Sequence, residues 1–233
     1  MIINAKLSDK ELLNAIYNAA HVYAKLVDNT YLIIGKNKNS DYFWFQCQFH
    51  KKHFMHLLGI DSKTLKANEF YDKCVAHNHG LDAGISIIDC TPSRNHNRTT
   101  VNEKSSCCAD MLRIQDAKYM KIGLKNKISQ NVDFSYAYGN TATLGFQESK
   151  SSLSFPITLI PKSIDTFASI KYKIIFLFEK KLTEMKYKKL IVEIKEGLFT
   201  ELLSEFPEKL KTLTHTSHTK NRHIIGSYAT LGI

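Results

Sequence analysis

Three histidines and two lysines fall within seven residues of the segment Phe45 to Ile60. An imidazole, with an ordinary pKa of about 6.5, can accept or release a proton near neutral pH, and a lysine ammonium supplies positive charge for a bound anion. A strand end needs no such density of titratable and cationic groups in order to fold. The segment is therefore a candidate active edge, built from His50, Lys51, Lys52, His53 and His56.

Hydrophobic spacing predicts the elements that position this segment. Thr30 to Gly35 and Asp41 to Phe49 are typical of the two strands of a hairpin, with a turn-rich stretch between them. If the second strand continues through His56, alternation places His50 on the same face as His56 and His53 on the opposite face. His56 is then the first candidate for proton transfer, and His53 is a phosphate contact rather than a second catalyst.

Helical patterns flank the hairpin. Ser8 and Glu11 form a capping-box signal at the start of an amphipathic first helix. A shorter helix is predicted near Leu65 to Ala76, with Ser62 as its cap, and helical spacing returns over Thr100 to Asp116. We expect these helices to pack together on whatever sheet the strands form.

The second half of the chain changes character. A last helix is predicted over Leu198 to Leu210, with Pro207 ending or kinking it. The predicted fold is a single α+β domain over residues 1–212, in which an N-terminal helix and a helical pair pack on an antiparallel β-sheet meander and a C-terminal helix follows. Residues 213–233 form a basic tail rich in His and Thr. The meander is predicted from strand-like runs at Lys118 to Leu124, Val132 to Tyr138, Thr141 to Phe146, Leu153 to Ile160, Lys171 to Phe178 and Lys189 to Ile194.

The charge balance favours a polyanionic partner. The 233 residues include 32 Lys and Arg against 22 Asp and Glu, a formal net charge of +10. Such a surplus attracts nucleic acid or an anionic surface through counterion release and long-range attraction. A lysine-rich surface that serves only solubility is an equally simple interpretation, because net charge does not say where the charges lie.

Cysteine usage and hydropathy indicate a cytoplasmic protein that does not enter membranes. The five cysteines are an odd number without regular spacing, and the first residues show no secretory signal, so free thiols in a reducing compartment are expected. The longest apolar run, Ile174 to Phe178, is far shorter than the roughly 20 residues that span a bilayer. Binding of the last helix to anionic lipid is opposed by its acidic residues Glu201, Glu205 and Glu208.

Two short motifs resemble a known family. The run His53 to Ile60, with Ala67 to Cys74 after it, is similar to the opening F-x-H-L-T-G-V … A-x-x-F-Y-x-x-C of a phage-associated nuclease-like family, the fourth phage group within the barnase, EndoU, colicin and RelE superfamily. Leu58 replaces the threonine of that pattern. The resemblance covers about Thr30 to Lys195 and continues in order through Lys104, Tyr138-Gly139, Leu144 to Phe146 and Leu159 to Ile164.

The resemblance implies metal-independent cleavage of RNA, with no cofactor. A base removes the 2′-OH proton, cations stabilise the charge on the phosphorane, and an acid protonates the leaving 5′-oxygen. His56 matches the motif histidine and is expected to transfer protons, and Lys104 to stabilise the phosphate. Tyr138 and Ser163 are further candidates by position alone. RNA contacts are expected from His50, Lys51, Lys52, His53 and Arg98. RNA is the implied substrate, a toxin or an effector in conflict between phage and host is the implied role, and a cognate inhibitor protein is an implied partner.

Each candidate also has a purely structural interpretation. His56 is equally well read as a histidine satisfied by a backbone carbonyl, and Lys104 as a solvated residue in the first turn of a helix. Tyr138 reads most simply as a core aromatic, and Ser163 as a turn cap. A non-catalytic nucleic-acid-binding or protein-binding module on the same fold is the alternative to an enzyme.

A zinc site is the main chemical rival. His50, His53 and His56 are spaced H-x-x-H-x-x-H, and Cys74, His77 and His79 form a second group of suitable donors. The irregular spacing and the lack of a Cys-x-x-Cys pair make this interpretation the weaker one.

Overall fold

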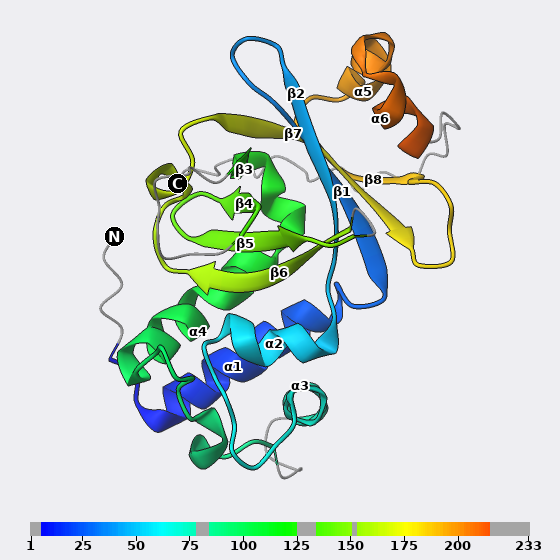
Figure 1. Ribbon diagram of the computed structural model, residues 1–233. Coiled ribbons are helices and arrows are strands. Elements are labelled where there is room, and N and C mark those ends of the chain that lie inside the picture. The colour runs from blue at the N-terminus through cyan, green and yellow to red at the C-terminus, as the bar shows by residue number, and fades with distance from the viewer. Residues whose placement is uncertain (1–5, 78–83, 125–133, 151–152, 215–233) are drawn as a thin grey trace, which may run out of the picture.

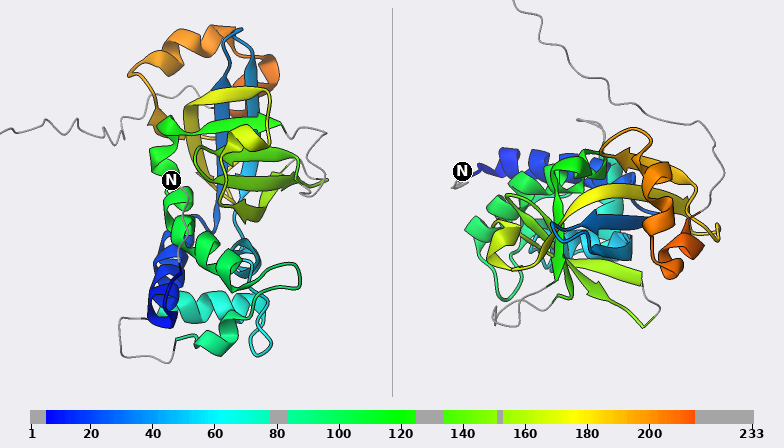
Figure 2. Two further views of the ribbon diagram at one scale, coloured as in Figure 1. Left: turned by 90° about the vertical axis from the view of Figure 1, so that its left-hand side faces the viewer. Right: turned by 90° about the horizontal axis from the view of Figure 1, so that it is seen from above.

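The computed structural model describes residues 6–77, 84–124, 134–150 and 153–214. Its helices gather at two ends of one sheet (Figure 1). The first four helices lie together at one end, and α5 and α6 lie at the other, and both further views keep this arrangement (Figure 2). The helices are α1 (Asp9–Ala24), α2 (Lys51–Leu57), α3 (Ala67–Ala76), α4 (Arg98–Leu112), α5 (Leu198–Leu202) and α6 (Glu208–Leu213). The mixed α/β fold confirms the predicted class.

The eight strands form one mostly antiparallel sheet that closes on itself. Their order is β1-β2-β6-β5-β4-β3-β7-β8, and an additional antiparallel pairing of β1 with β7 closes the first seven of these strands into a ring, with β8 paired to β7 outside it. Four strands of the predicted six-strand meander, β3 to β6, pair in chain order, and β7 pairs with β8. The meander is interrupted between β6 and β7, because β7 pairs with β3 and β1 instead of β6. Among the described strands, only β2 and β6 pair in parallel. The strands are β1 (Asn29–Lys36), β2 (Tyr42–Gln48), β3 (Lys121–Leu124), β4 (Tyr136–Gly139), β5 (Thr143–Glu148), β6 (Leu153–Ile160), β7 (Lys171–Lys181) and β8 (Lys189–Glu193).

The centre of strand β1, Tyr31 to Ile34, is apolar because both of its faces are covered. Tyr31 and Ile33 point into the main core, together with side chains from β2, β4 to β7 and the first four helices. Leu32 and Ile34 belong instead to a second core beneath α5 and α6. Alternate residues of a strand face opposite sides of the sheet, so a strand buried on both sides reads as a continuous apolar run. This position explains the sequence Tyr-Leu-Ile-Ile of β1.

Helix α1 begins at the predicted capping box. The Ser8 side chain accepts the Glu11 N–H, and the Glu11 carboxylate accepts the Ser8 N–H at 2.8 Å. The pair satisfies two of the N–H groups that a helix start leaves without partners. The buried face of α1 packs chiefly against α4, which fixes the helix that carries Lys104.

Helix α2 corrects the expectation that the second hairpin strand continues through His56. Strand β2 ends at Gln48, and Lys51–Leu57 is helical. Phe54, Met55, Leu57 and Leu58 are buried, which is the apolar stripe of a short helix rather than the alternation of a strand. His53 and His56 are therefore one helical turn apart instead of on opposite faces of a sheet.

The C-terminal helix is divided at the predicted proline. Pro207 lies directly before α6, and a short 3-10 turn, η4 (Leu203–Glu205), separates α6 from α5. Proline cannot donate the hydrogen bond that a continuous helix requires at this point. The predicted tail lies outside the described residues except for Leu213 and Thr214. Ser62, the predicted cap of α3, instead accepts the N–H of Thr64 and Leu65 in the preceding turn.

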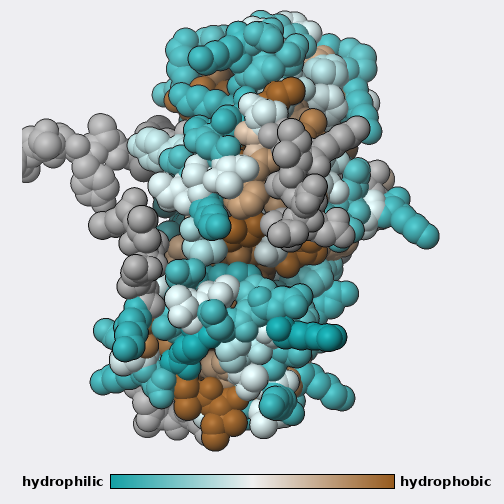
Figure 3. All heavy atoms as spheres, turned by 60° about the vertical axis from the view of Figure 1, so that its left-hand side comes forward, coloured by the Kyte–Doolittle hydropathy of each residue, from teal (hydrophilic) through white to brown (hydrophobic). Residues whose placement is uncertain are grey.

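Hydrophilic residues cover most of one face of the molecule (Figure 3). Hydrophobic residues are exposed there in a hollow at mid-height and at the end where the first helices lie. All five cysteines are buried and free. Within the described residues, none of the helices is both long and apolar enough to cross a membrane.

Candidate active site

The turn after α2 is a glycine C-cap. The Gly59 N–H donates to the His56 carbonyl at 3.0 Å, and the Ile60 N–H donates to the Met55 carbonyl at 3.2 Å. These two bonds, with Gly59 at a φ of +72°, form a Schellman motif. A left-handed backbone favours glycine, so the Leu-Gly-Ile sequence after an apolar stripe ends the helix here.

The loop before α4 is bonded to this turn. The Ser93 N–H donates to the Gly59 carbonyl, and the Asp61 N–H donates to the Thr91 carbonyl, both at 2.9 Å. Ile60 and Pro92 pair as an isolated β-bridge. The two segments are thus held in register, and His96 lies beside the glycine turn.

His96 connects Ser93 to Lys104. The Ser93 Oγ lies 2.8 Å from His96 Nδ1, and the Lys104 Nζ lies 2.9 Å from His96 Nε2. An ammonium can only donate, so with Lys104 charged the Nε2 atom accepts and Nδ1 carries the proton that it donates to Ser93. The three side chains therefore select one tautomer of the imidazole.

Gly59 makes this arrangement possible through its lack of a side chain. A Cβ atom at Gly59 would lie 3.0 Å from His96 Cδ2 and 3.3 Å from Lys104 Cδ. Few real Cβ atoms approach other atoms so closely, and the neighbours would have to move. The glycine of the His-Leu-x-Gly motif thus serves both the turn and the packing of the His96 and Lys104 side chains.

Lys104 is a buried cation with a neutral partner. Its side chain comes from the second turn of α4, and only 4% of the residue is exposed. Burial lowers its pKa to about 8 from an ordinary 10.5. Burial also lowers the pKa of His96, and the charge of Lys104 lowers it further, so that the imidazole is neutral at neutral pH.

The thiols beside Lys104 do not neutralise its charge. Burial raises the pKa of Cys107 to about 11 and raises that of Cys108 further, so both remain protonated at neutral pH. In the described parts of the chain no carboxylate forms an ion pair with Lys104. The drop in its pKa corresponds to about 3 kcal/mol of folding free energy. A bound anion would remove part of this cost.

His56 is a surface residue that precedes the Gly59 turn. It occupies the last turn of α2 and is exposed, and its carbonyl accepts the Gly59 N–H. Its backbone therefore lies one hydrogen bond from the residue that packs on His96 and Lys104. Among the described residues, no side chain forms a hydrogen bond with the His56 ring, which is thus accessible to a ligand.

His50 and His53 pack on an aromatic ring. The His50 and His53 rings lie 5.0 Å and 5.6 Å from the Phe155 ring, respectively. Burial lowers the pKa of His53 to about 4, with smaller contributions from Lys52 and the two neighbouring histidines, and burial also lowers the pKa of His50. Both imidazoles are therefore neutral at neutral pH, and any RNA contact that they make would not be ionic.

The other predicted cations differ in how far they are already paired. Lys51 forms an exposed ion pair with Asp72 at 2.8 Å. Arg98 donates to Asp9 at 2.7 Å and to the Asn102 side chain at 3.1 Å, from the first turn of α4. Lys52 is exposed, without an ion pair in the described segments.

Tyr138 and Ser163 are not bonded to His96 or Lys104. Tyr138 lies on β4 in the main core, 1% exposed, and burial raises its pKa well above the ordinary value. Its hydroxyl has no hydrogen-bond partner within the described residues. Ser163 caps the 3-10 turn η3 (Ile164–Thr166), where its hydroxyl accepts the Asp165 N–H at 3.2 Å. These positions match the core and cap interpretations of the two residues.

The donors of the predicted zinc site are described only in part. Cys74 is buried, and the His77 ring stacks on Tyr17 with 3.8 Å between centroids. His79 lies outside the described residues. In the part of the chain that the structure describes, no three His, Cys, Asp or Glu side chains are grouped as metal ligands.

Sequence reasoning missed His96 and Ser93 because both lie in a segment that composition marks only as a loop. One signal was available in α4. Lys104 shares helical spacing with Val101, three residues before it, and Cys108, four residues after it. A lysine within an apolar helical stripe either extends its ammonium to solvent or is buried, and a buried lysine requires a polar partner.

The fold and site together define an α/β protein in which a buried lysine is hydrogen-bonded to a neutral histidine. The family model of the phage-Barnase-EndoU-ColicinE5/D-RelE like nuclease 4 matches residues 15–196. The chain belongs to this nuclease-like family, which confirms the resemblance and extends it into α1. No curated protein and no solved structure matches the chain significantly. Family membership implies a nucleic-acid substrate.

Proposed function

We propose that the chain is an endoribonuclease that cleaves RNA without a metal ion, through attack of the 2′-OH on the adjacent phosphate. The observation that carries the proposal is the buried ammonium of Lys104, whose only described side-chain partner is the neutral imidazole of His96. A cation without a protein counter-ion stabilises negative charge that develops on a ligand. The phosphorane formed during RNA cleavage carries such a charge.

We assign each side chain of the site a separate role in this reaction. His56 is accessible and transfers protons, because an imidazole suits both removal of the 2′-OH proton and protonation of the 5′-oxygen. Lys104 stabilises the phosphorane. His96 and Ser93 act as positioning residues that hold the Lys104 side chain.

The proposed cellular role is that of a toxin or of an effector in conflict between phage and host. Cleavage of RNA would harm the cell that makes the enzyme. We therefore expect a cognate inhibitor protein as a partner. Co-expression with genes encoded beside this one, scored by survival of the host cells, tests for such an inhibitor.

The activity is tested with purified protein and end-labelled RNA in EDTA. We expect the wild type to leave 2′,3′-cyclic phosphate ends and His56→Ala to lose most of the cleavage. His21→Ala is the matched control, because His21 is an exposed histidine in the last turn of another helix, α1. Failure of the wild type to cleave tRNA, mRNA and rRNA would contradict the proposal and favour a non-catalytic binding module. Cleavage that is lost only in EDTA would indicate a metal-dependent reaction.

A further inference from the structure

A second cationic surface lies at the end of the sheet away from the first four helices. A groove of about 1020 Å³ runs between the tip of the β1–β2 hairpin, β3 and β7. Drug-sized ligands occupy pockets of about 300 to 1,000 Å³, so this groove has room for more than one nucleotide. Its lining includes five lysines, which are Lys36, Lys38, Lys121, Lys171 and Lys173.

Carboxylates neutralise only part of this charge. Lys36 pairs with Glu205 at 3.3 Å. Lys121 and Lys171 share Asp165, at 3.5 Å and 2.7 Å. The hydrogen bond from Lys171 is the largest cause that holds the pKa of Asp165 below its ordinary value. Among the described residues, the five lysines of the groove thus have only two carboxylate partners between them, which leaves a surplus of positive charge on a concave surface.

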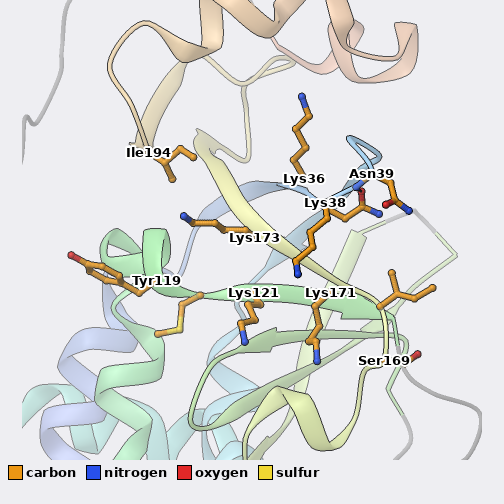
Figure 4. A pocket seen from close by; sticks show the side chains of 12 residues that line it. Lys36, Lys38, Asn39, Tyr119, Lys121, Ser169, Lys171, Lys173 and Ile194 are labelled. Carbon is orange, nitrogen blue, oxygen red and sulfur yellow. The ribbon is translucent and has the colours of Figure 1, made fainter.

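Lys38 and Lys173 supply most of this surplus positive charge. Both are exposed, and neither forms an ion pair within the described residues. Figure 4 shows Lys38 extending from the hairpin towards β3 and β7, where Lys121 and Lys171 lie side by side. Lys36 points away from them, towards the C-terminal helices. The ammonium groups are spread along the groove, as successive phosphates of a strand would require.

Exposed apolar side chains lie beside these lysines. Tyr119, Ile170 and Ile194 line the groove and are 67%, 55% and 37% exposed. Tyr119 stands at one end of the groove, next to Lys173 (Figure 4). Exposed aromatic and aliphatic surface offers a face on which unpaired bases can stack, and stacking together with phosphate contacts is characteristic of sites for single-stranded nucleic acid.

The strands around the groove do not suit an extended acidic peptide. A peptide that adds to a sheet needs a strand with an unpaired edge. In the described residues β1 pairs with both β2 and β7, and β3 pairs with both β4 and β7. The groove therefore offers side chains rather than backbone groups, which favours nucleic acid over a protein strand.

We propose that this groove binds single-stranded RNA, with its lysines on phosphates and its apolar residues against bases. The identity of the strand as RNA rests on the proposed function. Helix α4, which carries Lys104, leads through the 3-10 turn η2 (Ile114–Tyr119) directly into β3 and the groove. The groove is a binding surface distinct from the His96–Lys104 site, and it holds RNA that extends beyond the cleaved phosphate.

The test separates binding from cleavage. The probe is a fluorescent single-stranded 2′-O-methyl RNA of about 12 nucleotides, which lacks a free 2′-OH and cannot be cut by the proposed reaction. Its dissociation constant is measured by anisotropy over a range of salt concentrations. The groove variant is Lys38→Glu/Lys173→Glu. The matched control is Lys186→Glu/Lys188→Glu, which makes the same charge change at two exposed lysines between β7 and β8.

We expect the groove variant to weaken binding about tenfold or more and to reduce the salt slope by about 1.4, the effect of two lost phosphate contacts on a single strand. The control should change the dissociation constant by less than about twofold.

Two results would overturn the inference. The two double variants could lose affinity for the RNA equally, or the groove variant could bind the RNA as tightly as the wild type does. In the second case, a loss of affinity for polyglutamate would indicate that the groove binds an acidic peptide instead. If the wild type cleaves no RNA but the groove variant alone loses binding, the proposed catalysis fails and the groove remains a nucleic-acid site. If the wild type cleaves RNA and the groove variant binds normally, only the groove inference fails.

Discussion

The His96–Lys104 site and the lysine groove hold positive charge in opposite ways. Lys104 is 4% exposed and bonded to a neutral histidine, and burial lowers its pKa to about 8. Lys121 and Lys171 are about a third exposed, and both pair with the same carboxylate. A buried cation costs folding free energy and interacts strongly with a nearby anion, whereas exposed cations cost little and are screened by salt. The first arrangement suits stabilisation of one developing charge, and the second suits attraction of a long strand.

Replacement of the buried lysine should have the largest effect. Lys104→Met should lower cleavage about 10²- to 10³-fold, because the charge opposite the phosphorane is removed. The same change should raise the free energy of unfolding at neutral pH by up to about 3 kcal/mol, since a buried charge is replaced by an apolar side chain of similar size. Cleavage assays and urea denaturation measure the two quantities.

Lys173→Met is the control for this prediction. Lys173 is exposed, so its replacement should change the free energy of unfolding by less than about 0.5 kcal/mol. A loss of stability in Lys104→Met would contradict the account, because it would show that the Lys104 charge is well compensated within the fold.

A substitution in the glycine turn should have the next largest effect on stability. Gly59→Ala should lower the free energy of unfolding by about 2 to 3 kcal/mol, because it combines a left-handed backbone with contacts to His96 and Lys104. Gly197→Ala is the control, since Gly197 has a φ of +80° but nothing within 4 Å of the added Cβ. It should cost only about 1 kcal/mol. Equal losses in thermal or urea denaturation would show that the packing on Gly59 contributes nothing.

Both stability and cleavage should depend on pH through the buried Lys104. The Lys104 pKa of about 8 lies below its ordinary 10.5, so the unfolded chain binds more protons than the folded chain in this interval. The stability of the wild type relative to Lys104→Met should therefore rise from pH 8 to 10.5 and be lowest below pH 8. Cleavage should fall above about pH 8 as the ammonium loses its proton. A cleavage profile that is flat to pH 10 would exclude Lys104 as the charged group.

Replacement of Asp165, the carboxylate beside the groove, should have the smallest effect of these changes. Asp165→Asn should tighten binding of the uncleavable RNA about two- to threefold, because Lys121 and Lys171 lose a competing partner. The free energy of unfolding should change by less than about 0.5 kcal/mol, since the ion pairs are exposed. Unchanged or weaker RNA binding in the anisotropy assay would count against phosphate contacts at these lysines.

Sequence periodicity predicted most elements but not how the sheet closes. The capping box at Ser8 and Glu11, the hairpin and the later strands all depend on local patterns. The pairing of Tyr31 with Glu179 joins residues far apart in the chain, and no local pattern specifies it. The sequence did not predict helix α2, because the alternating aromatic residues of β2 continue to Phe49 and suggest a longer strand. Gly59, which follows an apolar stripe, is a helix stop signal that could have indicated the helix.

The site was predictable only in part. The family motif led to His56 and Lys104, and the structure connects the backbone of the first to the packing of the second through Gly59. His96 could not be chosen from the sequence, because its role depends on a loop that hydrogen bonds to Gly59 and Asp61 hold in place. Loop geometry of this kind follows from tertiary contacts rather than from composition.

The pKa of Lys104 tests the central claim most directly. It can be measured by NMR titration of the lysine Cε carbons in the labelled protein, with Lys104→Arg to assign the resonance. We expect Lys104 to titrate near pH 8 and its pKa to rise when the 2′-O-methyl RNA binds, because a phosphate near the ammonium favours its charged form. A pKa near 10.5, or one that the RNA leaves unchanged, would contradict the claim that this site holds a buried cation for the phosphate of RNA.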